Sequence, residues 1–120
     1  MENLCKIREL CRTVSKYGED FEQKHGIGLN EGMLLCCLEK EGSIPSGEIS
    51  RQLGLTASNA SKVIRSAEEK SLIIRQMGKE DKRKMYFVLS PSGKELLEKI
   101  KRDPVDTPPL LSGCLENITL

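Results

Sequence analysis

A chain of 120 residues with 38% hydrophobic residues is long enough for one modest domain. It has no Trp and only two Tyr and two Phe, which favours aliphatic packing between helices over an aromatic-rich β-sandwich. No apolar run approaches the roughly 20 residues that cross a bilayer, and the first ten residues alternate charged with apolar side chains. We therefore expect one soluble, cytoplasmic domain over 1–120, with no signal peptide and no membrane partner.

The net charge of +1 is unevenly distributed along the chain. Residues 51–84 carry nine Lys or Arg and four acids, a net of +5, so the remaining residues carry −4. This asymmetry indicates one surface suited to a polyanion on an otherwise acidic body.

The cysteine pattern argues against both disulfides and metal. An odd number of cysteines in a chain without a signal peptide favours reduced thiols. There is no CxxC motif and only one histidine. We expect neither a metal site nor a cofactor, and we expect the thiols to be buried as small hydrophobic groups. The five are Cys5, Cys11, Cys36, Cys37 and Cys114.

The N-terminal half predicts two helices. Apolar residues recur every three or four positions over about 3–24, from Leu4 to Phe21, and glycines at 26 and 28 end that helix. Asn30 is a candidate N-cap for a second helix that runs to about Lys40. Its inward residues are expected to be Met33, Leu34, Cys37 and Leu38.

A helix-turn-helix pattern follows. Pro45 suits the first turn of a short helix over about 46–53, which Gly54 ends. Thr56 is the expected N-cap of a helix over 56–70. The apolar stripe that packs this second helix on the others consists of Ala60, Val63, Ile64 and Ala67.

The pattern then changes to strands. Residues 72–77 and 85–89 are β-rich and flank the charged loop GKEDKRK, which predicts a hairpin with a basic tip. A last helix begins after Ser90 and ends at Asp103, because Pro104 disfavours helical geometry before it. The tail 101–120 is broken by prolines but keeps apolar residues at helical spacing, so we expect it to pack on its own domain or on a partner subunit. The fold class is mainly α with a small β-hairpin: a winged helix-turn-helix.

One face of the helix 56–70 lies opposite its apolar stripe and carries short polar or basic side chains. Arg and Lys reach guanine or phosphate oxygens, and Ser and Asn give close hydrogen bonds in the major groove of duplex DNA. The same composition also occurs on ordinary solvated faces. The candidate DNA-binding residues are Ser58, Asn59, Ser61, Lys62, Arg65 and Ser66.

The hairpin adds a second basic element next to that helix. A long basic loop between two strands can reach the minor groove, where narrow A·T-rich stretches attract arginine. Asp81 can accept a hydrogen bond from Arg83 and orient its guanidinium. The candidate residues of this wing (77–85) are Lys79, Asp81, Lys82, Arg83 and Lys84.

Residues 29–100, the expected winged-helix core, resemble the multiple-antibiotic-resistance regulator (MarR) family. The resemblance rests on Lys62-Val63-Ile64 and Glu68 of the recognition helix, on Leu72-Ile73 with Arg75, on Asp81-Lys82-Arg83, and on Leu89-Ser90 followed by Gly93. The chain departs from the family at Ser71, where glycine is usual, at Ala67, and in its proline-broken tail.

The resemblance implies a homodimeric transcription regulator, a repressor of double-stranded DNA targets, often released by a small-molecule effector or an oxidant. It implies that the recognition helix enters the major groove and the wing the minor groove. The helix 3–24 is then the surface for packing or dimerisation. Contacts with the DNA backbone are expected from Ser46, Thr56 and Arg75.

Two alternatives stay open. A winged helix can serve as a protein-interaction module whose basic face contacts an acidic partner. The chain can also be a thiol-based regulator through Cys5 or Cys11, although the apolar stripe suggests that Cys11 is buried. An enzyme is not expected, because there is no nucleotide-binding glycine loop and only one histidine.

Overall fold

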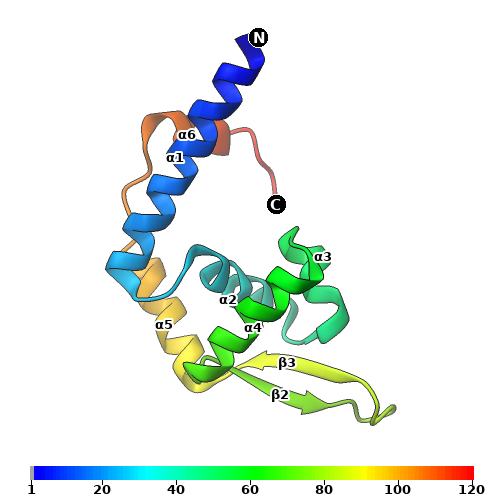
Figure 1. Ribbon diagram of the computed structural model, residues 1–120. Helices are drawn as coiled ribbons and strands as arrows, with labels where there is room; N and C mark the ends of the chain where they lie inside the picture. Colours follow the sequence, from blue (N-terminus) through cyan, green and yellow to red (C-terminus); the bar gives the residue numbers. More distant parts are fainter. Residues whose placement is uncertain (1) are drawn as a thin grey trace. The chain divides into compact units, whose positions relative to one another are not determined.

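The computed structural model describes residues 2–120 (Figure 1). It confirms a mainly helical winged-helix fold with a small antiparallel sheet. The elements in chain order are α1 (Glu2–His25), α2 (Leu29–Glu41), β1 (Ile44–Pro45), the 3₁₀ turn η1 (Ser46–Glu48), α3 (Ile49–Leu53), α4 (Ala57–Glu69), β2 (Ile73–Met77), β3 (Met85–Leu89), α5 (Pro91–Arg102) and α6 (Pro109–Leu115).

These elements fall into two compact units. Residues Leu29–Arg102 form the winged-helix unit, and α1 with the segment up to Gly28 joins Asp103–Leu120 in a second, terminal unit. Among the residues that the structure describes, no helix is both long and apolar enough to span a membrane.

The core of the winged-helix unit is aliphatic. Leu34, Leu35 and Leu38 of α2 are almost fully buried, together with Ile49 of α3 and Leu97 of α5. The inward face expected for α2 is wrong, because the buried face is rotated from it by part of a helical turn.

Two assignments in α2 need correction. Leu35 is buried, whereas Met33 is 43% exposed and Cys37 is half-buried. The helix also begins at Leu29, so Asn30 lies inside it and is not its N-cap. Residues 32–38 of the helix are all apolar, so the sequence leaves the inward face of this stretch to be chosen by its neighbours.

A short strand replaces the expected first helical turn at Pro45. Ile44 pairs with Phe87 and Pro45 with Tyr86, which makes a three-stranded sheet of order β1-β3-β2. Ile44 is 1% exposed and Phe87 2% exposed, so burial of these two side chains stabilises the pairing. Proline is tolerated here because β1 is an edge strand.

The hairpin joins the end of α4 through a tightly bonded junction. Ser71 has φ 61°, the only positive φ of a non-glycine residue among those described. Its carbonyl oxygen accepts a 2.6 Å hydrogen bond from Ser90 Oγ. Ser90 Oγ in turn accepts a 2.9 Å bond from the Gly93 backbone N–H, and the Ser90 N–H donates to Leu72 O at 3.0 Å. The start of the wing is therefore fixed to α4 and α5.

In the terminal unit, α1 packs against α6, and Lys24 forms an ion pair with Asp103 at 2.9 Å. The apolar stripe of α1 is buried only at its C-terminal end, at Phe21, whereas Leu4 is 65% and Ile7 54% exposed. Most of the stripe therefore does not cover a core within the monomer.

The expectation of buried thiols is wrong. Cys5, Cys11, Cys36 and Cys114 are exposed, and Cys37 is half-buried, which raises the pKa of its thiol above the ordinary value of 9.0. All five are free cysteines.

Candidate nucleic-acid interface

The recognition helix α4 is fixed at its first turn and along its inner face. Thr56 is the N-cap, as expected, and its Oγ1 accepts a hydrogen bond from the Asn59 backbone N–H at 3.1 Å. Gly54, in the left-handed conformation at φ 67°, ends α3 and turns the chain into α4. Ala60 and Ala67 are buried, so the opposite face of α4 points to solvent.

That outer face carries the candidate residues. Ser66 is half-buried at its border, and the other five are exposed: Ser58, Asn59, Ser61, Lys62 and Arg65. No bulky apolar side chain is among them. The exposed groups are therefore hydrogen-bond donors and cations, which suits contact with phosphates and base edges.

At the C-terminal end of α4 a different contact holds the helix. Glu31, in the first turn of α2, is buried, and its carboxylate accepts hydrogen bonds from Lys70 Nζ at 2.9 and 3.0 Å. This ion pair ties the C-terminal end of α4 to α2.

The wing tip is basic and internally ordered. Lys79, Lys82, Arg83 and Lys84 are exposed, and Asp81 is partly covered. The expected orienting contact is present. Asp81 Oδ1 accepts from the Arg83 backbone N–H at 3.0 Å and from Arg83 Nε at 3.2 Å. These two hydrogen bonds, the backbone one first, hold the pKa of Asp81 below its ordinary value of 3.8.

Backbone hydrogen bonds close the loop of the wing where it leaves the two strands. The Gly78 N–H donates to Lys84 O at 2.8 Å, and the Lys84 N–H donates to Asp81 O at 3.0 Å. A Cβ at position 78 would lie 2.6 Å from Asp81 O, so this approach requires glycine.

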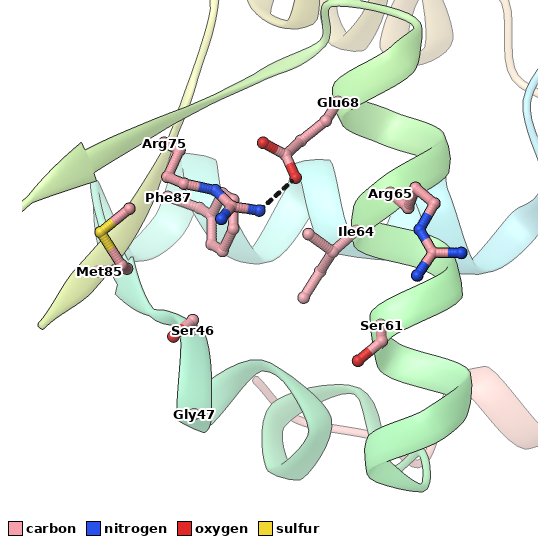
Figure 2. A pocket seen from close by; sticks show the side chains of 9 residues that line it. All are labelled: Ser46, Gly47, Ser61, Ile64, Arg65, Glu68, Arg75, Met85 and Phe87. Carbon is pink, nitrogen blue, oxygen red and sulfur yellow. Dashed lines mark hydrogen bonds and ion pairs between the residues drawn. The ribbon is translucent and has the colours of Figure 1, made fainter.

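A hollow of about 500 Å³ lies between α4 and the sheet (Figure 2). Ser61, Ile64, Arg65 and Glu68 line it from α4, Arg75, Met85 and Phe87 line it from the strands, and Ser46 and Gly47 line it from η1. The outer face of α4 and the strands β2 and β3 thus border one depression of the winged-helix unit.

Arg75 has partners within the protein. Its Nη2 donates to Glu68 Oε1 at 2.8 Å, and its Cζ lies 5.3 Å from the centroid of the Phe87 ring. Arg75 is a predicted contact of the DNA backbone, whereas neither Glu68 nor Phe87 is a predicted site residue. Strand alternation places residues 75 and 87 on one face of the hairpin, but nothing local in the sequence brings Glu68 to them.

The strand pairing and the capped helix pair define a winged helix-turn-helix protein. Residues 27–85 match the model of the MarR family. The winged-helix core of this chain is thus a MarR-family domain.

The individual relatives agree with this assignment. The chain is 29% identical over 89 residues to the uncharacterized HTH-type transcriptional regulator YkoM of Bacillus subtilis, with 74% of this chain and 58% of YkoM covered. It spans about three fifths of the length of the curated relatives that it matches.

Two solved structures show the same fold. A mutant MarR from E. coli complexed with operator DNA superposes with a TM-score of 0.74 at 16% identity, over 98% of this chain and 85% of that one. NadR in complex with 4-hydroxyphenylacetate gives a TM-score of 0.69 at 16% identity, over 85% and 72% of the two chains.

Proposed function

We propose that this protein binds double-stranded DNA, with α4 in the major groove and the wing in the adjacent minor groove. The observation that carries the proposal is the shared hollow. The exposed Ser61 and Arg65 of α4 border the same depression as the strands β2 and β3 of the wing. A recognition helix fits a major groove about 12 Å wide, which leaves the hairpin to reach past the phosphates.

Within this arrangement the residues take different roles. Lys62 and Arg65 contact base edges or phosphates, and the smaller Ser58, Asn59 and Ser61 give close hydrogen bonds. Ser46 and Thr56 flank α4 and contact the backbone. At the wing tip, Asp81 holds Arg83 in one orientation, and an oriented guanidinium suits a narrow minor groove.

We further propose that the protein acts as a homodimer through its terminal unit. Five large apolar side chains of α1 and α6 are at least 40% exposed: Leu4, Ile7, Val14, Leu110 and Leu115. Exposed apolar surface of this kind on one unit marks an interaction site. Two copies would then present two α4 helices to a pseudopalindromic site.

The mode of regulation follows as a proposal. A dimer that occupies neighbouring grooves blocks access to the DNA that it covers, so we propose that the protein is a repressor. We also propose that it is cytoplasmic. The NadR complex with 4-hydroxyphenylacetate supports a small-molecule effector for this chain as well.

Selection of bound sequences from a random duplex pool, followed by titration of the selected duplex at several salt concentrations, tests the proposal. If the protein contacts six to ten phosphates, its affinity for the duplex falls by a factor of roughly 10³–10⁵ as the salt concentration rises from 50 to 200 mM. A palindromic consensus is the expected result. No duplex retained at low salt would instead indicate a protein-interaction module with an acidic partner.

A thiol-regulated version of this function has one observation in its favour. Cys5 and Cys11 are both exposed, so an oxidant can reach them. Peroxide treatment is then expected to lower DNA affinity in the native protein and to have no effect after Cys5→Ser and Cys11→Ser. An unchanged affinity of the oxidised native protein would exclude this version.

A further inference from the structure

We propose that the Glu68–Arg75 ion pair is a positioning device that sets the distance between the wing and the recognition helix. Arg75 then acts on DNA through the placement of the wing and not as a phosphate ligand. The proposal rests on the DNA-binding function argued above, but part of its test needs no DNA.

Arg75 contacts both Glu68 of the helix and the ring of Phe87 in the sheet. Arg75 Nη2 lies 2.8 Å from Glu68 Oε1, and the Arg75 guanidinium lies over the buried ring of Phe87. Phe87 is opposite Arg75 in the β2–β3 register and opposite Ile44 in the β1–β3 register. One cation is therefore held between an acid on the helix and a ring in the middle of the sheet.

The ion pair lies apart from the junction that fixes the start of the wing. At its base the wing is fixed to the end of α4 by the bonds of Ser71 and Ser90. Beyond that junction the hollow separates the hairpin from α4, and the Glu68–Arg75 bond crosses it (Figure 2). The pair is placed to limit rotation of the hairpin about its base.

The pair also balances a negative charge on the wall of the hollow. Glu68 is an acid on the wall of a hollow that is expected to face phosphates, where an unpaired carboxylate would repel DNA. Pairing with Arg75 balances that charge, and it occupies Nη2, one of the three guanidinium nitrogens through which Arg75 could bind a phosphate. An ion pair without net charge in this place fixes the position of the wing and adds little electrostatic attraction to DNA.

The DNA-free test measures amide hydrogen exchange in Arg75→Ala and Glu68→Ala proteins. The probes are the amides of Gln76 and Tyr86, which are paired across the hairpin and, by alternation from the Gly78–Lys84 bond, form a hydrogen-bonded pair of the ladder. Leu34 and Leu97 are the core references. We expect both variants to exchange about fivefold faster in the wing and at native rates in the core. Unchanged wing exchange, or equal acceleration in the core, would overturn the positioning role.

The DNA test measures affinity and its salt dependence on the duplex selected by the native protein. Each single variant is expected to bind about fivefold more weakly, the double variant no more weakly than either single, and the salt slope to stay native. If Arg75 binds a phosphate, Arg75→Ala reduces the slope by about one and Glu68→Ala strengthens binding. That result would overturn the proposal.

Glu39→Ala is the matched control. Glu39 of α2 forms an ion pair with Lys101 of α5, another contact between two elements of the same unit but outside the hollow. This variant is expected to change neither wing exchange nor DNA affinity, and a change in either would overturn the assignment to the Glu68–Arg75 pair. If the native protein selects no duplex, the proposed function fails, but the exchange experiment still decides whether the pair holds the wing.

Discussion

Gly93 of α5 stands directly against the backbone of Leu72. A Cβ added to Gly93 would lie 2.1 Å from the Leu72 carbonyl oxygen and 3.1 Å from its carbonyl carbon. The same carbonyl accepts the Ser90 N–H, so Leu72 cannot withdraw without breaking the junction between α4, the wing and α5.

Gly93→Ala is therefore expected to lower the free energy of unfolding by about 3 kcal/mol, because backbone atoms would have to move apart. Urea denaturation measures the change. Gly47→Ala is the control, since a Cβ there meets nothing within 4 Å, and its stability should stay within about 0.5 kcal/mol of native. Equal stability of the two variants would contradict the close approach.

Ser71→Gly is expected to raise the free energy of unfolding by roughly 0.5–1 kcal/mol. Ser71 has φ 61°, which strains a residue with a Cβ but not glycine. The hydrogen bond from Ser90 uses the Ser71 carbonyl and survives the change. Ser92→Gly, in the first turn of α5, is the control and should be neutral or destabilising. Thermal unfolding compares the two variants, and only Ser71→Gly raises the melting temperature if the strain is real.

Lys62→Ala and Arg65→Ala are each expected to weaken specific DNA binding by about 1–3 kcal/mol if they contact bases. Binding to the selected duplex and to a scrambled duplex, measured by fluorescence anisotropy, separates base contacts from phosphate contacts. Lys99→Ala removes the same charge from an exposed position of α5 and should have a smaller effect than either. If all three variants bind alike, the outer face of α4 is not the interface.

The wing turn is expected to depend on pH in one direction. The pKa of Asp81 is lowered on folding, so its contribution to the wing is present above its ordinary value of 3.8 and is lost as the pH falls through the depressed value. A carboxyl titration by NMR measures this pKa directly. In Arg83→Ala the value should rise only in part, because the backbone N–H of residue 83, the larger cause, remains. A complete return to 3.8 would show that the side chain dominates.

Ile7→Asp is expected to weaken dimerisation at least about tenfold, because a charge would have to be buried in the proposed apolar interface. Sedimentation equilibrium measures the dissociation constant. Ile74→Asp, at an exposed apolar position of β2, should leave the oligomeric state unchanged. A native protein that is monomeric at all concentrations would exclude a dimer formed through the terminal unit.

Several elements were evident from local sequence because their causes are local. Thr56 caps α4 by accepting a hydrogen bond from the backbone N–H of Asn59, three residues later. Gly54 ends α3 by adopting a left-handed conformation. The second wing strand begins and ends where the β-rich run of residue types placed it, at Met85 and Leu89. The Asp81–Arg83 contact spans two residues, so spacing alone predicts it.

Other features depend on partners that are distant in sequence. The two-residue strand β1 exists because Ile44 pairs with Phe87, and the inward face of α2 was chosen by the helices and strands around it. The stripe of α1 has helical periodicity whether or not anything covers it, so its exposure could not be read from spacing. Arg75 was evident as a cation, but its contact with Glu68 arises only when the hairpin folds back along α4. Local backbone preferences thus set the elements and their caps, whereas the hollow and the pair that crosses it result from packing between them.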